Sequence, residues 1–323
     1  MDDNERMRAD VEIPVVAVIG PTAAGKSDLA LDLALALDGE VVNADSMQLY
    51  RGMDIGTAKL PLGERREVPH HLLDVLDVTD EARVAAYQSA ARGAFAQIRL
   101  RGRVPILAGG SGLYVAAVLD QLNFPGTDPA VRGELEGELA ALGAPVLHAR
   151  LARLDPAAAA AIAPVNGRKL VRALEVIELT GGPFAAALPV GAHAEAMPCV
   201  RIGLKAPRPL LHERIRLRVD RMWAAGLVDE VLGLETLGLR SGRTAPRALG
   251  YAQILRWFDG WGTEADAVEA TVVATRQFAR RQETWFRRDP AVQWLPFDAP
   301  DLAEQVLDRV RQATSARGST APR

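Results

Sequence analysis

The chain has 323 residues, a formal net charge of -3 at pH 7, 49% hydrophobic residues and 24% charged residues. This composition is typical of a soluble globular protein and excludes a chain that is mainly disordered or collagen-like, while the single cysteine excludes an internal disulfide framework. The small net charge excludes a protein whose whole surface binds nucleic acid, but it allows a local basic patch.

The start of the chain carries no targeting pattern. Residues 1–10 are charged and lack the apolar core of a signal peptide, and no apolar run is long enough to cross a bilayer. We therefore expect a cytoplasmic protein with no membrane partner. The oligomeric state is not set by the sequence, and a monomer is our working expectation.

The first part of the chain alternates strand and helix patterns. Residues 13–19 form an apolar, β-rich run, a Gly-rich turn follows, and residues 28–37 have helical periodicity. The same criteria predict strands at 40–43, 72–76 and 104–108 and a helix at 81–100. Strands that alternate with helices predict an α/β fold in which a parallel sheet is flanked by helices.

The segment 125–195 is different, because it is rich in Ala, Leu and Glu and has almost no strand pattern. We interpret it as a mostly helical insertion domain that divides the core into 13–124 and 196–313. After the insertion we predict a strand at 200–204, helices at 209–225, 247–258 and 263–288, and a last strand that ends at Trp294. The polar ends, 1–12 and 314–323, are expected to be disordered tails.

The strongest local motif lies between the first strand and the first helix and fits the phosphate-binding pattern G-x4-G-K-[ST]. It consists of Gly20, Pro21, Thr22, Ala23, Ala24, Gly25, Lys26 and Ser27. Glycines let the backbone wrap an anion, and the amides and dipole at the helix start favour negative charge. The motif is shared with ATP-binding and other nucleotide-binding proteins. It predicts a P-loop NTPase-like sheet that binds a diphosphate or triphosphate.

Three side chains of this loop have predicted roles toward the phosphates. Lys26 would place a compact ammonium group between phosphate oxygens, where a guanidinium group would not fit. Thr22 would donate a hydrogen bond from the loop. Ser27 would supply a hydroxyl ligand to a Mg²⁺ ion that bridges phosphate oxygens, so the sequence predicts Mg²⁺ as the cofactor.

Two features separate the chain from hydrolytic ATPases. The strand at 104–108 runs into Gly109-Gly110-Ser111-Gly112, where motor-type ATPases have an aspartate that holds magnesium and water. Asp45 follows the second strand, at the carboxyl end of the sheet, where ligands of open α/β folds bind. From position alone, Asp45 is a general base, a helix cap or a sugar contact.

Five sequence blocks together resemble tRNA dimethylallyltransferases. They lie in the expected order and comprise Gly20–Ser27, Asn43–Lys59, Pro69–Leu72, Gly109–Tyr114 and Arg280–Arg287. The resemblance implies an enzyme that attaches the five-carbon group of dimethylallyl diphosphate to the exocyclic N6 of the adenine beside the anticodon, position 37 of tRNA. Diphosphate is released.

The resemblance also implies the catalytic residues. The lone pair of adenine N6 is delocalised into the ring, so the reaction needs an acceptor for the N6 proton, and Asp45 matches the base of the family. Negative charge develops on the leaving diphosphate, and Lys26 and Thr22 face that charge. Arg218, in the helix predicted at 209–225, matches an arginine that reaches the diphosphate from the opposite side.

The tRNA contacts implied by the resemblance concern the anticodon stem-loop. They are Asp45, Ser46, Met47, Gln48, Ser111, Arg132, Arg168, Arg172, Arg247, Gly250, Tyr251, Arg280, Arg281, Gln282, Thr284, Trp285 and Arg287. Arginines next to aromatic residues also suit an RNA loop by themselves, because guanidinium groups pair with phosphates and flat side chains stack on extruded bases. Core packing remains an equally good interpretation of Trp285. The insertion at 125–195 would grip the anticodon stem.

Three alternatives remain open at this stage. A nucleotide kinase would share the phosphate loop and the sheet, and a prenyltransferase that acts on free adenosine phosphates would share nearly every motif. An RNA-binding protein that uses a nucleotide as a switch is the third alternative. The basic and aromatic block that starts at Arg276 disfavours the kinase, and Asp45 beside the phosphate loop disfavours a protein that only binds.

Overall fold

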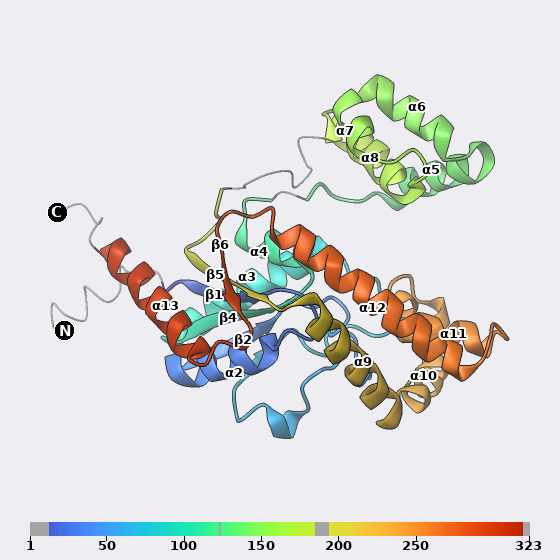
Figure 1. Ribbon diagram of the computed structural model, residues 1–323. Coiled ribbons are helices and arrows are strands. Elements are labelled where there is room, and N and C mark those ends of the chain that lie inside the picture. Colours follow the sequence, from blue (N-terminus) through green and yellow to red (C-terminus); the bar gives the residue numbers. More distant parts are fainter. Residues whose placement is uncertain (1–12, 123, 185–193, 319–323) are drawn as a thin grey trace. The chain divides into compact units, whose positions relative to one another are not determined.

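The computed structural model describes residues 13–122, 124–184 and 194–318. These residues form two compact units (Figure 1). One unit, which we call the sheet unit, contains the described residues up to Asp120 and from Ala194 onward. The other, which we call the helical unit, contains the described residues between Gln121 and His193. The sequence prediction placed the limits of this insertion at 125 and 195.

In the described part of the chain, six parallel strands form one sheet in the order β3-β2-β4-β1-β5-β6. Their bounds are β1 Val15–Ile19, β2 Gly39–Asn43, β3 His70–His71, β4 Val104–Gly109, β5 Cys199–Lys205 and β6 Val292–Pro296. All five residues of β1 are buried, as expected for a central parallel strand that is covered on both faces. The predicted α/β fold with a parallel sheet and flanking helices is confirmed.

The described helices of the sheet unit are α2 Lys26–Leu37, α3 Val84–Leu100, α4 Gly112–Leu119, α9 Arg208–Ala224, α10 Leu227–Thr236, α11 Tyr251–Phe258, α12 Glu264–Phe286 and α13 Leu302–Gly318. No helix in the described ranges combines the length and the apolar character that crossing a membrane requires.

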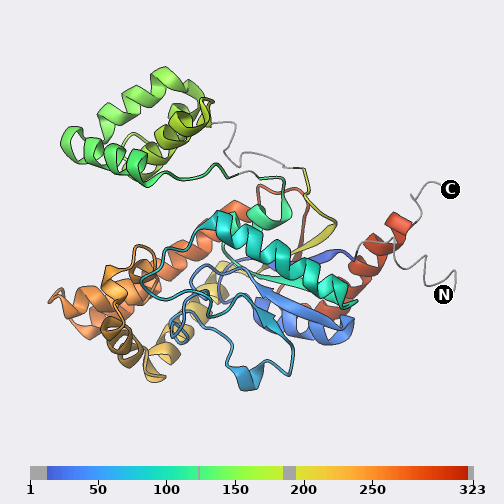
Figure 2. The same ribbon diagram turned by 180° about the vertical axis from the view of Figure 1, so that it is seen from behind.

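Alternating side chains of β1 build the two cores of the sheet. Val16 and Val18 pack with residues of α2 and α13 on one face. Val15, Ala17 and Ile19 pack with residues of α3 and α4 on the other face, which Figure 2 shows from the α3 side. This is the period-two pattern of a strand that is buried on both sides.

Helices α9 to α12 lie beyond the sheet, and α10 and α11 build a third core there. Leu227 and Val231 of α10 pack there with Tyr251 of α11. Tyr50 and Met53, which belong to the long connection between β2 and β3, complete this core. The connection after β2 is therefore packed between the sheet and the outer helices, at the carboxyl end of the strands.

Several predicted elements need correction. The strand predicted at 72–76 is wrong, because β3 is the two-residue strand His70–His71 and Leu72 turns the chain with a φ of 61°. The tail predicted from residue 314 is also wrong in part, since α13 continues to Gly318 after Val306 and Val310 anchor it on the core. Helices α4, α10 and α13 were not predicted.

The helical unit is built from four described helices, α5 Pro129–Leu142, α6 Ala144–Leu154, α7 Pro156–Ala161 and α8 Gly167–Thr180. Leu135, Leu147, Leu151 and Leu170 form its own apolar core. The side chain of Asp128 caps α5 by accepting hydrogen bonds from the Ala130 and Val131 amides. A mostly helical insertion, as predicted, follows from the Ala- and Leu-rich composition.

The chain leaves the sheet unit and returns to it at adjacent points. Asp120 and Glu195 form an isolated antiparallel bridge, and the Ala196 amide donates a 2.8 Å hydrogen bond to the Leu119 carbonyl. The buried guanidinium group of Arg201 in β5 reinforces this junction through ion pairs with Asp120 at 2.5 Å and Asp289 at 2.6 Å.

Candidate active site

The phosphate-binding loop joins β1 to α2, and its two glycines are required by its geometry. Gly20 has a φ of 140°, and a Cβ at this position would lie 2.8 Å from the Leu204 carbonyl oxygen. Gly25 has a φ of 83° at the start of α2. L-residues with side chains rarely adopt these conformations. The ammonium group of Lys26 donates a 2.8 Å hydrogen bond to the Pro21 carbonyl, which holds it against the loop.

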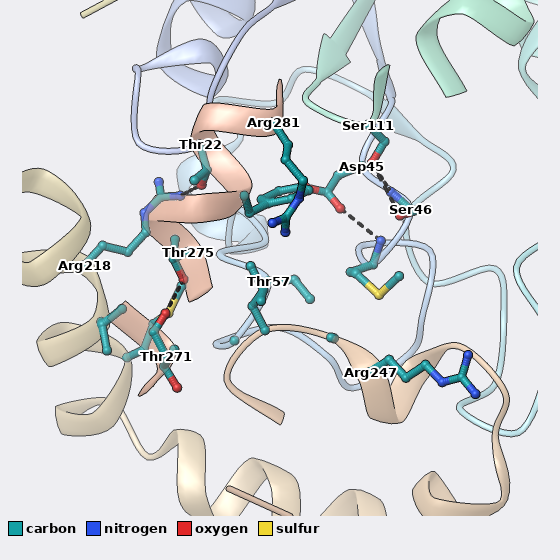
Figure 3. Close-up of a pocket in the computed structure, with 17 residues that line it drawn as sticks. Thr22, Asp45, Ser46, Thr57, Ser111, Arg218, Arg247, Thr271, Thr275 and Arg281 are labelled. Atoms are coloured by element: carbon teal, nitrogen blue, oxygen red, sulfur yellow. Dashed lines mark hydrogen bonds between the residues drawn. The ribbon is translucent and has the colours of Figure 1, made fainter. Parts of the chain in front are cut away.

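Two arginines from α9 face the same loop. Arg214 donates a 2.8 Å hydrogen bond to the Ala23 carbonyl, and Arg218 donates one of 3.0 Å to the Thr22 hydroxyl (Figure 3). The loop and these arginines line a cavity of about 190 Å³, which we call the anion cavity. Asp45 and Gln48 also line this cavity.

The charges around the anion cavity favour a multiply charged anion. Burial and, to a smaller extent, the positive charge of Arg218 lower the pKa of Lys26 to about 8, and Asp45 opposes this shift. Burial also lowers the pKa of Arg218, and Arg214 adds to this effect. Each shift reports that a cation is held in an enclosed place next to another cation. A bound diphosphate would relieve this repulsion.

Asp45 is held by a turn at the end of β2. The Asn43 side chain accepts a 2.8 Å hydrogen bond from the Asp45 amide and donates one of 2.9 Å to the Asp45 carbonyl. One carboxylate oxygen of Asp45 accepts a 2.9 Å hydrogen bond from the Met47 amide. Burial raises the pKa of the Asp45 carboxyl, although the Met47 amide, Lys26 and Arg218 pull it down. The position suits a carboxylate that accepts a proton.

A second cavity, of about 270 Å³, adjoins the anion cavity, and we call it the mixed cavity (Figure 3). The two cavities share four lining residues, which are Thr22, Asp45, Thr57 and Arg218. The Asp45 carboxylate and the Arg218 guanidinium group therefore lie where the two cavities adjoin.

The walls of the mixed cavity that α9 and α12 supply are largely apolar. Met222 and Phe278 line it. Thr271 and Thr275 also line it, but their hydroxyl groups donate to the helix carbonyls of Ala267 at 2.8 Å and Thr271 at 2.7 Å. Threonines bonded in this way offer mainly their methyl groups to the chamber. The cavity can therefore hold a flat or branched apolar group beside the anion site.

Six of the fourteen tRNA contacts predicted in the sheet unit line the mixed cavity. Its lining includes Asp45, Ser46, Met47, Ser111, Arg247 and Arg281. The Ser111 hydroxyl accepts a 3.1 Å hydrogen bond from the Ser46 amide, which ties the turn after β4 to the segment of Asp45. The predicted contacts that are exposed on α12 or directly after it are Arg280, Thr284 and Arg287. Gln48 lines the anion cavity instead.

Four of the predicted tRNA contacts are buried, wholly or in part, or are engaged in contacts within the protein. Tyr251 is fully buried and donates its hydroxyl hydrogen to Glu230. Gly250 is buried at the start of α11. Trp285 packs on the core beneath α4, where a Cβ on Gly112 would lie 2.3 Å from its ring. The core-packing interpretation of Trp285 is thus the one that the structure supports.

Gln282 is the fourth of these residues. It is 5% exposed, its carbonyl accepts a 2.9 Å hydrogen bond from the Thr22 amide, and its NH₂ group donates one of 2.9 Å to the Gly110 carbonyl. Both ends of the side chain therefore tie α12 to the phosphate loop and to the end of β4, and the side chain is not presented to a macromolecule.

We expect Gln282→Ala to destabilise the fold and to leave tRNA affinity nearly unchanged. Two partly enclosed backbone groups would lose their partners, which costs about 1–3 kcal/mol of unfolding free energy. The neighbouring variant Arg281→Ala is the matched contrast, since it should weaken tRNA binding and lower its salt dependence without lowering the melting temperature. Thermal unfolding and tRNA binding titrations check both. A Gln282→Ala protein of normal stability that loses tRNA affinity would contradict the internal role.

The three arginines predicted to contact tRNA from the insertion belong to the helical unit. Arg132 and Arg172 both form ion pairs with the buried Glu175, at 2.6 and 2.8 Å. Arg172 also donates to the Pro125 carbonyl at 2.6 Å. These two side chains are therefore engaged within the unit, whereas Arg168 is exposed on α8.

Ser27, the predicted magnesium ligand, lies in the lining of the anion cavity. Ser27 is exposed at the start of α2 and lines the anion cavity together with Asp28. Within the described ranges, His, Cys, Asp and Glu side chains form no group of three that could hold a metal. Mg²⁺ commonly takes one or two protein ligands and completes its shell with phosphate oxygens and water. The residues present suit that kind of binding.

Two residues of the site had no role predicted from the sequence, and they are Arg214 and Thr57. Arg214 holds the loop at Ala23, and its spacing of four residues from Arg218 puts both on one face of α9. Thr57, which lines both cavities, lies within a block used for the family resemblance, but nothing in its local sequence marks it.

Comparison with known protein families gives one consistent result. A family model described as IPP transferase matches residues 48–289. A tRNA dimethylallyltransferase of Thermobifida fusca is 66% identical over 298 residues, which are 91% of this chain and 93% of the relative. One of Kineococcus radiotolerans is 60% identical over 314 residues, covering 94% of this chain and 98% of the relative.

Two solved structures have the same fold over nearly the whole chain. The tRNA isopentenylpyrophosphate transferase of Bacillus halodurans has a TM-score of 0.72 and 38% identity, with 95% of this chain and 99% of that chain covered. A eukaryotic dimethylallyltransferase acting on tRNA has a TM-score of 0.77 and 25% identity, with 96% and 81% covered.

Proposed function

The chain belongs to the IPP transferase family, and we propose that its two adjoining cavities transfer the dimethylallyl group of dimethylallyl diphosphate to N6 of an adenine in tRNA. The observation that carries this proposal is the placement of Asp45 and Arg218 in the lining of both cavities. A donor diphosphate and an acceptor base can then meet at a carboxylate. The adenine beside the anticodon, position 37, is the proposed target.

The anion cavity suits the diphosphate of the donor. As the bond between the allylic carbon and the bridging oxygen breaks, negative charge builds on that oxygen. Lys26, Thr22 and Arg218 lie around the loop where this charge would develop. Fixed donors aimed at developing charge lower the barrier because they need little reorganisation. Mg²⁺ held by Ser27 would add positive charge toward the phosphate oxygens.

The mixed cavity suits the prenyl group and the extruded adenine. An adenine in an RNA loop must leave its stack before N6 can reach an enclosed site. Asp45 would take the proton that N6 loses as the carbon–nitrogen bond forms, and its raised pKa makes it a stronger base than a solvated carboxylate. The released diphosphate remains among the cations of the loop until it leaves.

The RNA would be held by exposed cations near the mouth of the mixed cavity. Arg247 and Arg281 line the cavity itself, and Arg280 and Arg287 are exposed nearby in sequence on α12 and directly after it. We propose that the helical unit grips the anticodon stem, with Arg168 as its exposed cation among the predicted contacts.

A labelling assay tests the proposed acceptor. The protein is incubated with labelled dimethylallyl diphosphate and, in separate reactions, with unmodified tRNA, AMP or ATP. Label in tRNA, located by nuclease mapping at the adenine beside the anticodon, is the expected result. Label in AMP or ATP instead would identify a prenyltransferase that acts on free adenosine phosphates. If no acceptor gains label, the protein binds these ligands without transferring a prenyl group.

The proposed donor site also predicts a dependence of donor affinity on pH. Lys26 is charged below its pKa of about 8, and the diphosphate binds the charged form. Donor affinity should therefore fall as the pH rises through 8, by up to about tenfold per pH unit for one lost charge. Equilibrium binding of a non-reactive donor analogue from pH 7 to pH 9.5 measures this. The same titration on Lys26→Met should be flat, and a wild-type protein with flat affinity would exclude the lysine as a ligand.

A further inference from the structure

Glu230 lies outside the lining of both cavities, yet it holds the loop that forms part of each. It belongs to the first turn of α10. Its carboxylate accepts hydrogen bonds from three consecutive backbone amides, those of Asp54 at 3.0 Å, Ile55 at 2.7 Å and Gly56 at 3.2 Å. Successive amides that converge on one carboxylate form a nest, which fixes the backbone more firmly than a single bond does.

The loop held by Glu230 carries functional surface. Gly56 and Thr57 line the mixed cavity, and Thr57 and Ala58 line the anion cavity. Gln48, from the segment that follows Asp45, donates a 3.1 Å hydrogen bond to the Thr57 carbonyl. The loop is therefore fixed by Glu230 on one side and bonded to the Asp45 segment on the other.

Close packing shows that the position of this loop is tightly defined. A Cβ on Gly56 would lie 2.4 Å from the ring of Tyr251, whose hydroxyl donates to the same Glu230 carboxylate. Lys59 holds the loop further along, through Asp54, Asp74 and the Tyr50 carbonyl. The ammonium group of Lys59 donates only to oxygen atoms in these contacts, whereas the amides of residues 54–56 donate to Glu230.

We propose that Glu230 is a positioning residue for prenyl transfer, which acts by fixing the Gly56–Thr57 wall against Asp45 and the phosphate loop. This inference rests on the proposed function. An acceptor nitrogen, an allylic carbon and a base must be aligned at once, and a displacement of about 1 Å can cost about a hundredfold in rate. Loss of Glu230 should therefore affect the transfer step more than substrate binding.

The test compares Glu230→Ala, Glu230→Gln and Gly56→Ala with the wild-type enzyme in single-turnover reactions with saturating tRNA and donor. Glu230→Ala should slow transfer about 10- to 100-fold, whereas KM for each substrate should change less than about threefold. Glu230→Gln keeps a carbonyl acceptor and should recover part of the rate. Gly56→Ala displaces the loop while Glu230 is intact, so it should reproduce the loss. Asp229→Asn, the exposed neighbour on α10, is the matched control and should behave as wild type.

Amide hydrogen exchange in the absence of substrates gives a readout that does not depend on activity. Residues 54–56 should exchange faster in Glu230→Ala than in the wild-type protein. Faster exchange in Glu230→Ala together with a wild-type transfer rate would overturn the positioning role. A lower melting temperature with unchanged turnover in Glu230→Gln and Gly56→Ala would overturn it as well. If the wild-type enzyme labels no tRNA, the proposed function fails, while the exchange result still decides whether Glu230 fixes the loop.

Discussion

Replacing Asp45 with Asn is expected to slow prenyl transfer to tRNA by about 10² to 10⁴, because the acceptor of the N6 proton is removed. Asn has nearly the same shape, and its carbonyl oxygen can still accept the hydrogen bond from the Met47 amide that Asp45 accepts at 2.9 Å. The turn after β2 should therefore persist, and tRNA affinity should remain close to that of the wild-type protein. Single-turnover transfer and tRNA binding titrations measure the two quantities.

The same substitution should not destabilise the protein. The folded-state pKa of Asp45 is raised above its unfolded value, so the ionised carboxylate costs stability as the pH rises through that interval, and this cost persists at neutral pH. Asn removes the cost, and the variant should unfold at the same temperature as the wild-type protein or higher. Asp308→Asn, at an exposed position of α13, is the control for a lost surface carboxylate. Equal transfer rates in Asp45→Asn and the wild type would remove Asp45 from the mechanism.

Replacing Lys26 with Met is the second substitution with a large expected effect. The ammonium group is enclosed beside the loop and opposes the charge that develops on the departing diphosphate, so its loss should lower the transfer rate by about 10² to 10³. Donor affinity should fall as well, because the charge also acts on the bound diphosphate. Met retains the length and much of the apolar stem of the side chain, which limits the change to the charge and its hydrogen bond to Pro21.

Stability measurements separate this effect from misfolding. The folded-state pKa of Lys26, about 8, is lower than its unfolded value, so holding the charged form costs stability at neutral pH when no anion is bound. Lys26→Met should thus melt no earlier than the wild-type protein in the absence of donor. Donor or diphosphate should raise the melting temperature of the wild-type protein clearly and that of the variant only weakly. Arg311→Ala, an exposed site on α13, controls for the loss of a positive charge. A variant with normal transfer and normal stabilisation by diphosphate would contradict the role of Lys26.

The parts of the site that could be predicted are those determined by short-range sequence. The phosphate loop is a run of eight consecutive residues between a strand and a helix, so its conformation follows from its own glycines and helix start. Asp45 follows a predicted parallel strand, and ligands of open α/β folds bind at the carboxyl ends of such strands. The structure has Asp45 in the lining of both cavities. Both inferences needed only the identity and order of neighbouring elements.

The remaining features depend on contacts that sequence periodicity does not contain. Gln282 bonds to the amide of Thr22 across 260 residues of sequence, and an amide side chain in a basic block gives no sign of such a partner. Tyr251 and Trp285 lie in blocks that suggested RNA contacts, but the packing of other elements buries Tyr251 fully and Trp285 in part. The short β3 escaped detection because two residues are too few to show alternation.

The junction at Asp120 and Glu195 has a consequence for how this molecule can change over evolutionary time. An antiparallel bridge joins the segment that leaves the sheet unit to the segment that returns to it, and the ion pairs of Arg201 stabilise this bridge. The two ends of the insertion are therefore held next to each other by the sheet unit itself. The segment between these two residues can therefore be shortened, lengthened or replaced without a change in the topology of the sheet unit. Lineages could therefore vary the accessory module while the transfer chemistry is conserved.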